Sequence, residues 1–212
     1  MKIKHLGQAC FAVESSNGKI VLDPFAPMVG KMPKDLTASV VTVSHQHGDH
    51  SYTKGVGGNP EIIDQTGSWD IAGFEIQSVS TFHDKVGGKK RGNNIVYVIK
   101  SDGITICHLG DLGHKLSEEQ LKEIGTVDIL MIPVGGTFTI DPTEAVAVIN
   151  QIKPKIVLPM HFKPKKSLIP FPLATVDKFT EVLGWPVKEV EELEVDGSNL
   201  DSLSHQAIIF KK

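Results

Sequence analysis

The sequence has few cysteines and no long apolar segment. Only two cysteines, Cys10 and Cys107, occur in 212 residues, and they lie far apart. We expect free thiols rather than a disulfide, because the N-terminus also lacks the apolar core and small-residue cleavage site of a signal peptide. No apolar run approaches the roughly 18 to 20 residues that span a bilayer, so we expect no membrane-spanning helix. A cytoplasmic location is the simplest expectation.

An excess of positive charge is also missing. The chain has 22 basic and 25 acidic residues, which gives a formal net charge of -3. This balance does not favour binding to nucleic acid or anionic membranes by bulk attraction. The hydrophobic fraction of 40% suits a globular core. The length suits one domain over residues 1–212, with two small domains as the alternative.

Hydrophobic patterning predicts strands in the first half of the chain and alternating strands and helices in the second half. Expected strands span residues 2–6, 10–14, 19–22, 40–43, 74–80, 94–100, 104–109, 127–134, 155–161 and 205–210. Expected helices span residues 116–125, 141–154 and 173–183, the first two with Ser117 and Asp141 as N-caps. Residues 189–195 are compatible with a strand or an acidic turn. This order favours a sheet-rich, layered α/β domain.

The segment "HQHGDH", residues 45–50, crowds three of the nine histidines and an aspartate behind an apolar β-branched strand. Imidazole and carboxylate together suit zinc or a similar metal. In an extended segment His45 and His47 would face one side, while Gly48 would let the backbone turn so that Asp49 and His50 face a second position. A hydrophilic loop explains a lone histidine better than it explains this cluster. The segment therefore suggests two adjacent ions rather than one.

Three further candidate ligands each follow an expected strand, as His45 does. They are His83 in "STFHD", Asp111 in "ICHLGDLG" and His161 in "VLPMHF". One edge of a sheet gathers residues that are distant in sequence, so these side chains are expected to meet the hexapeptide. Singly, each could equally be an ordinary loop or strand-end residue. Together with the hexapeptide, they supply the ligands that two ions require.

The order of these residues, D…HxHxDH…H…D…H, resembles the metallo-β-lactamase superfamily. Asp23 in "VLDPF", the hexapeptide, His83, Asp111 and His161 fill its five motif positions in order. The similarity runs from "HLGQACFAVE" through "PMHF". Within the superfamily, segments such as "HLGQACFAV", "GDLG" and "IPVGGTFTID" look like the small single-domain hydrolases related to ascorbate-6-phosphate lactonase.

The resemblance implies a four-layer αβ/βα sandwich with the active site on one edge, and two divalent ions, most simply Zn²⁺ with Mn²⁺ or iron as alternatives. It also implies roles for each motif residue. The first ion would be bound by His45, His47 and His83, the second by Asp49, His50 and His161, with Asp111 bridging both and Asp23 bracing the motif loop by hydrogen bonds. His108 and His114 flank Asp111 and compete with His83 for its role.

The expected reaction is hydrolysis of a small ester, lactone or phosphodiester by metal-activated water, which Asp49 would orient. Cys107 and His108 are neighbours in one strand and point to opposite faces, so they make a poor catalytic dyad. The alternatives are a nuclease of the same superfamily and a non-hydrolytic metal-binding or redox protein. The nuclease is disfavoured by the net charge and by the short chain.

Substrate recognition is less defined. Arg91, in the glycine-rich segment 85–94, offers paired donors to the phosphate or carboxylate of an anionic small molecule, although a solvated loop arginine is about equally compatible. Residues 163–172, after His161, fit either a pocket rim or a subunit contact in a homo-oligomer. No nucleic-acid or membrane partner is expected.

Overall fold

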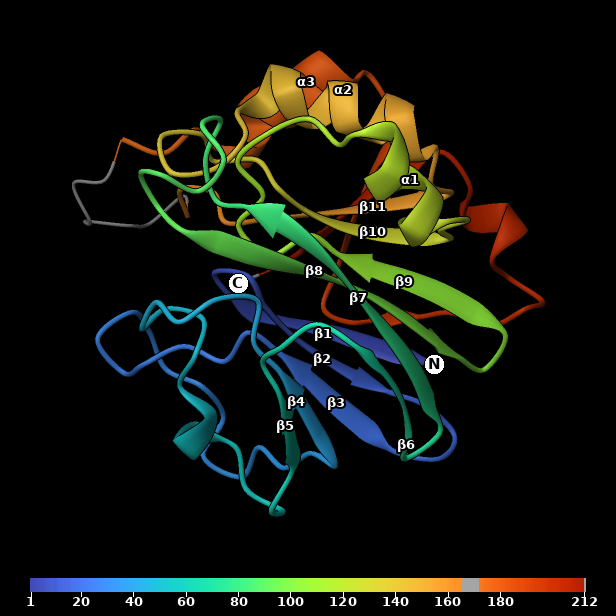
Figure 1. Ribbon diagram of the computed structural model, residues 1–212. Coiled ribbons are helices and arrows are strands. Elements are labelled where there is room, and N and C mark those ends of the chain that lie inside the picture. The colour runs from blue at the N-terminus through green and yellow to red at the C-terminus, as the bar shows by residue number, and fades with distance from the viewer. Residues whose placement is uncertain (165–171, 212) are drawn as a thin grey trace.

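Two mixed β-sheets pack face to face, and three α-helices cover one of them (Figure 1). The computed structural model describes residues 1–164 and 172–211. The six-stranded sheet has the order β13-β1-β2-β3-β4-β5, and the eight-stranded sheet has the order β12-β14-β11-β10-β9-β8-β7-β6. The strands are β1 (Lys2–Gly7), β2 (Cys10–Glu14), β3 (Lys19–Leu22), β4 (Val40–Thr42), β5 (Glu61–Ile63), β6 (Ser68–Ile71), β7 (Phe74–Phe82), β8 (Asn93–Ser101), β9 (Ile104–His108), β10 (Ile129–Pro133), β11 (Ile156–Met160), β12 (Val187–Val190), β13 (Leu193–Glu194) and β14 (Gln206–Phe210).

The helices lie over the outer face of the eight-stranded sheet (Figure 1). They are α1 (Glu118–Ile124), α2 (Pro142–Ile152) and α3 (Val176–Leu183), and two short 3₁₀ helices are η1 (Thr53–Gly55) and η2 (Asp201–Leu203). Ser117 and Asp141 cap α1 and α2 through complete capping boxes, which confirms both expected N-caps. No helix in the described part of the chain is both long and apolar enough to cross a membrane.

Three apolar clusters fill the spaces between the layers. The largest lies between the sheets and includes Phe11, Ile20 and Tyr97. A second packs the helices onto the eight-stranded sheet, with Phe179 of α3 among its members. The third lies on the six-stranded sheet, where loop residues such as Phe25 cover the strands. The αβ/βα sandwich is confirmed, and in the described chain its fourth layer consists of loops and η1.

The strands that precede the candidate ligands all end at one edge of the sandwich. β3 and β4 pair in parallel, as do β9, β10 and β11. β7 and β9 both pair antiparallel with β8, so they run in the same direction. Carboxyl ends of strands that run the same way meet at the same edge of a sheet, which is where ligands bind in open α/β sheets.

Most expected elements are present, with ends shifted by a few residues. Two strands, β5 and β6, were not expected. They are only three and four residues long, and most of their side chains are exposed or half-buried. Residues 189–195 form neither one strand nor one turn. The chain there ends β12 in the eight-stranded sheet and then enters β13 in the six-stranded sheet. Cys10 and Cys107 are free and buried, as expected.

Tyr97 of β8 joins the two sheets by a polar contact inside the apolar core. Its side chain is fully buried, and its hydroxyl donates toward the Val43 carbonyl oxygen at 3.0 Å and the Ile63 carbonyl oxygen at 2.9 Å. Val43 follows β4, and Ile63 ends β5. A buried carbonyl that loses its donor carries a desolvation penalty, so this hydroxyl stabilises the strand ends from which the hexapeptide departs.

We therefore expect Tyr97→Phe to lower the free energy of unfolding by about 1–2 kcal/mol. Urea denaturation followed by fluorescence or circular dichroism measures it. The chain's other tyrosine, Tyr52, is half-buried and supplies the control. Tyr52→Phe is expected to change stability by less than about 0.5 kcal/mol. Equal losses in the two variants would contradict a bridging role for Tyr97.

Candidate metal centre

The hexapeptide leaves β4 as a series of bends and a turn, not as the extended segment that we expected. The His50 N–H donates to the His47 carbonyl oxygen at 2.9 Å, which closes the turn. His45 and His47 still face each other, with ring centroids 4.6 Å apart, because the chain bends between them. Gly48 does not have a left-handed φ, and a Cβ there would contact nothing within 4 Å. The turn therefore does not require glycine, which corrects the role expected for Gly48.

Three groups of potential ligand atoms lie at this edge, and one of them, Asp23 with His45 and His50, shares its histidines with the other two. His45, His47 and His83 place ligand atoms within 4.8 Å of one another, and so do Asp49, His50 and His161. These are the two triads that the resemblance implied. They come from the segments after β4, β7 and β11, which are far apart in sequence.

Asp111, after β9, lies between the two groups. Its Oδ2 is 3.2 Å from Nε2 of His83 in the first group. The same oxygen is 3.3 Å from Nε2 of His50 and 3.3 Å from Nε2 of His161, both in the second group. One buried carboxylate oxygen therefore contacts both triads, as a bridging residue requires.

Several buried polar atoms at the centre lack hydrogen-bond partners among residues 1–164 and 172–211. They include His45 Nε2, His50 Nε2 and Asp111 Oδ1. Buried polar atoms are almost always paired, so a set of orphaned atoms on facing side chains needs an explanation. Imidazole nitrogens and carboxylate oxygens are the donors that zinc and related divalent metals take. The residues present fit such a metal.

Hydrogen bonds around Asp23 aim two of these imidazoles at the centre. The Ser44 hydroxyl donates to Asp23 Oδ2 at 2.6 Å, so it accepts from His45 Nδ1 at 2.9 Å. Nδ1 of His50 donates to the same Asp23 oxygen at 2.8 Å. In both rings Nδ1 is therefore occupied by a hydrogen bond, which directs Nε2 toward the centre as the nitrogen that a metal would take. The contacts of Asp23 match the bracing role expected for it.

The charges at the centre also favour a cation. Burial lowers the pKa of His45 to about 3, and the neighbouring His50 adds to the effect. Burial would raise the pKa of Asp111, but His161 and His50 outweigh it and hold that pKa well below its usual range. His45 is therefore neutral and Asp111 ionised at neutral pH, as metal ligation requires.

The two histidines that competed with His83 face away from the centre. Nε2 of His108 donates to the Ala9 carbonyl oxygen at 2.8 Å, and its Nδ1 accepts from the Gly110 N–H at 3.3 Å. Nδ1 of His114 donates to the Lys115 carbonyl oxygen at 2.7 Å, and its Nε2 accepts from a backbone N–H. Each imidazole uses both nitrogens on the backbone. The structure thus brings His83, and neither competitor, to the centre.

Two residues that support the centre were not expected from the sequence. Gln8, in the β1–β2 turn, donates from Nε2 to Asp49 Oδ2 at 2.9 Å. Asn94 accepts the Asp111 N–H at 2.9 Å and donates to the Leu109 carbonyl oxygen at 3.0 Å, which fixes the loop between them. Asn94 could have been predicted as a supporting residue, because it is an asparagine in an otherwise apolar strand. No local sequence feature predicted the role of Gln8.

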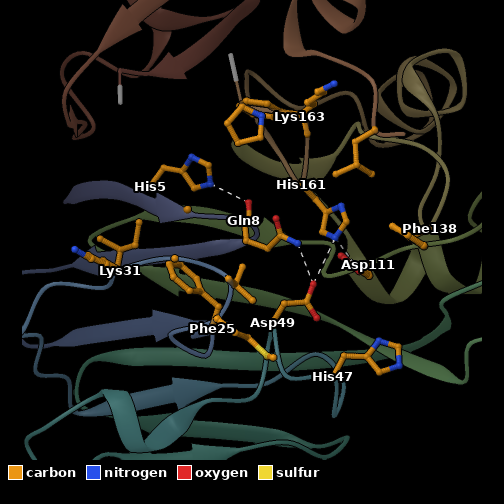
Figure 2. A pocket seen from close by; sticks show the side chains of 18 of the residues that line it. His5, Gln8, Phe25, Lys31, His47, Asp49, Asp111, Phe138, His161 and Lys163 are labelled. Atoms are coloured by element: carbon orange, nitrogen blue, oxygen red, sulfur yellow. Dashed lines mark hydrogen bonds and ion pairs between the residues drawn. The ribbon is translucent and has the colours of Figure 1, made fainter. Parts of the chain in front are cut away.

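A cavity of about 620 Å³ opens over the centre (Figure 2). His47, Asp49, His83, Asp111 and His161 contribute to its lining. The remaining wall is largely apolar with a few cations: Leu6, Phe25, Met28, Val29, Phe138, Phe162, Pro164 and Leu173, with Lys31, Arg91 and Lys163. The two ends of the expected rim at residues 163–172 are described, while residues 165–171 lie outside the described residues. The volume suits a small molecule.

Comparisons with known proteins identify the family. Residues 2–161 match the family described as the beta-lactamase superfamily domain. A metal-dependent hydrolase of Carboxydothermus hydrogenoformans is 32% identical over 196 residues, covering 76% of this chain and 84% of the relative. One of Pyrococcus furiosus is 30% identical and covers 90% and 95%. A solved structure from Thermotoga maritima, assigned to the metallo-β-lactamase superfamily, is 39% identical with a TM-score of 0.81, covering 99% and 97%. The chain therefore belongs to the metallo-β-lactamase superfamily and is a metal-dependent hydrolase.

Proposed function

We propose that the enzyme hydrolyses a small ester, lactone or phosphodiester at a centre that holds two divalent ions. The observation that carries this proposal is the position of Asp111, whose Oδ2 lies 3.2 Å from Nε2 of His83 and 3.3 Å from Nε2 of His50. A single ion would leave one of the two triads without a role. Two ions that share one carboxylate would account for the orphaned His45 Nε2, His50 Nε2 and Asp111 Oδ1.

The ligand sets follow from the two triads. The first ion takes His45, His47 and His83, the second takes Asp49, His50 and His161, and Asp111 is shared. We favour zinc, because three imidazoles are a common zinc ligand set and the Thermotoga maritima relative is described as a candidate Zn-dependent hydrolase. Manganese and iron accept the same ligands and are the alternatives.

Divalent ions at such a centre lower the pKa of water and polarise the oxygen of the scissile group. The chain itself supplies orientation. The Asp49 side chain is 30% exposed, and its Oδ2 is held at 2.9 Å by the Gln8 amide. Burial raises the pKa of Asp49, but hydrogen bonding to His50 outweighs it, and the net pKa lies below the usual range. Asp49 is therefore ionised at neutral pH. Its carboxylate orients the attacking water by accepting a hydrogen bond from it. Apolar side chains, including Phe25 and Phe138, line the cavity over the centre.

We also propose a domain organisation, a compartment and an assembly for the chain. A single domain over residues 1–212 is supported by one apolar cluster that joins Ile3 near the start to Phe210 near the end. The two free, buried cysteines support a reducing compartment such as the cytoplasm. A small-molecule substrate agrees with the size of the cavity. We keep a homo-oligomer as the proposed assembly, to be checked by light scattering.

Asp111→Ala is expected to remove more than half of the bound metal, because it strips a shared ligand from both ions. Turnover is expected to fall by at least about a hundredfold. Elemental analysis of the purified protein and a panel of esters, lactones and phosphodiesters measure the two effects. Asp70→Ala, at an exposed aspartate of β6, is the control and is expected to change neither. Near-normal metal and turnover in Asp111→Ala would rule out the two-ion assignment.

His83→Ala and His108→Ala separate a ligand from a structural histidine. We expect His83→Ala to lose metal, and His108→Ala to keep it while lowering the free energy of unfolding by about 1–3 kcal/mol, because two buried backbone groups lose a partner. Metal per folded protein, measured after gel filtration, and urea denaturation give the comparison. His108→Asn serves if the alanine variant does not fold. Greater metal loss at position 108 than at 83 would reverse the ligand assignment.

A further inference from the structure

Arg91 is the chain's only arginine, against 21 lysines, and it lines the cavity over the centre. Its guanidinium carbon lies 4.6 Å from the centroid of the Phe138 ring. Stacking on an aromatic face leaves the planar fork of N–H donors directed outward, and that fork matches a carboxylate or phosphate. Surface lysines such as Lys2, Lys19 and Lys85 pair with acidic side chains. Arg91, in contrast, forms no ion pair within residues 1–164 and 172–211. Its charge is therefore available to a ligand.

The loop that carries Arg91 is fixed by one carboxylate. Asp84 Oδ1 accepts the N–H groups of Val86 and Gly88 at 2.8 and 2.9 Å. Asp84 Oδ2 accepts the N–H groups of Lys90 and Arg91, both at 2.8 Å. The one carboxylate therefore accepts four backbone N–H groups of the loop. A glycine-rich segment that would otherwise be free is thus held in one conformation.

Three further contacts tie this loop to its surroundings. The Gly92 N–H donates to the Gly88 carbonyl oxygen at 2.9 Å, and the His83 N–H donates to the Gly92 carbonyl oxygen at 3.0 Å. Lys85 pairs with Glu144 of α2 at 2.5 Å. Gly88 has a φ of +79, which only glycine adopts readily. The candidate ligand His83 precedes the loop and is hydrogen-bonded to Gly92 at the end of it. Arg91 therefore has a defined position relative to the centre.

The rest of the cavity offers a different environment. Phe25, Met28 and Val29 line it with apolar surface, and Met28 is 88% exposed. In Figure 2, Phe138, the ring beneath Arg91, lies on one side of Asp111, and Lys31 lies on the other. A ligand that fills this cavity therefore meets a guanidinium at one end and, toward the opposite end, mainly apolar side chains with Lys31 among them.

We propose that the substrate carries, apart from its scissile group, a carboxylate or phosphate that Arg91 binds over Phe138, and an apolar portion that packs against Phe25 and Met28. This inference rests on the proposed hydrolase function and names its substrate class. Asp84 is a positioning residue in it, because its carboxylate fixes the loop and makes no contact with the ligand. The neighbouring Lys89 and Lys90 are exposed and do not line the cavity, so they lie outside the anion site.

A matched pair of esters tests the proposal. Monophenyl succinate carries a carboxylate, while phenyl butyrate is a neutral ester of similar length, and both release phenol. We expect the wild type to prefer the anionic ester in kcat/KM, and Arg91→Met to reduce that preference by about tenfold or more. Arg91→Lys is expected to fall between them, because it keeps the charge and loses the paired donors. Lys90→Met, which removes a charge from the same loop, is expected to retain the preference.

Asp84→Ala is expected to reduce the same preference through KM, with the metal content retained, and Asp84→Asn is expected to reduce it less. Calorimetric titration of the metal-loaded protein with phenylacetate and with phenyl phosphate measures anion binding without turnover and shows which anion is preferred. We expect Arg91→Met to weaken the preferred anion by about tenfold.

The outcomes separate the two proposals. If the wild type hydrolyses neither ester, nor any lactone or phosphodiester in the wider panel, the proposed function fails, and the titration alone decides the anion site. If both esters are hydrolysed and Arg91→Met leaves the preference and the anion affinity within twofold of the wild type, the inference is overturned while the hydrolase remains. Equal loss in Lys90→Met would show a general charge effect and would also overturn it.

Discussion

The centre depends on one buried carboxylate that is surrounded by imidazoles. Asp111 is 2% exposed, and its Oδ2 contacts Nε2 of His50, His83 and His161. An ionised carboxylate that is removed from water is costly unless positive charge or hydrogen bonds compensate it. The backbone N–H of Asp111 donates to Asn94. The groups that stabilise the charge on its carboxylate oxygens therefore have to come from the centre itself. The neighbouring His161 and His50 offset part of this cost, and a cation held between the two triads, as proposed above, would offset it further and couple metal binding to the stability of this edge.

The surrounding chain is shaped to hold that arrangement. Gln8, Asp23 and His161 all have left-handed φ angles of +52, +46 and +50. Non-glycine residues adopt this conformation at a cost, and such residues cluster at functional sites where the surroundings enforce them. Each of the three makes contacts that do so: the His161 N–H donates to the Gln8 carbonyl oxygen at 3.0 Å, and Asp23 accepts bonds from Ser44 and His50. Among the described residues, three of the nine non-glycine residues with left-handed φ angles therefore lie at the centre, where these contacts hold them.

The limits of the sequence-based prediction follow from the range of the interactions involved. His45, His83, Asp111 and His161 could be found because each is a ligand type placed directly after a predictable strand, and strand direction then brings them together. Gln8 reaches Asp49 across 41 positions of sequence, and no local pattern encodes that distance. The bends of residues 45–50 were likewise misjudged as extended, because the turn forms through contacts with Ala26 and within the loop. The structure brings together the residues of both expected triads, although the local backbone of residues 45–50 differs from the expectation.

Asp84 links recognition to the metal centre through a single loop. Its immediate neighbour His83 faces Asp111, and the carboxylate of Asp84 holds the loop back to Arg91, which stacks on Phe138. A ligand residue and the proposed anion anchor thus belong to one hydrogen-bonded unit that closes on itself between His83 and Gly92. The distance from anchor to centre is then fixed by backbone bonds rather than by side-chain packing alone. Such rigidity favours a substrate in which the anion and the scissile bond are a set distance apart, since an anchor on a mobile loop would accept many spacings and orient none of them well.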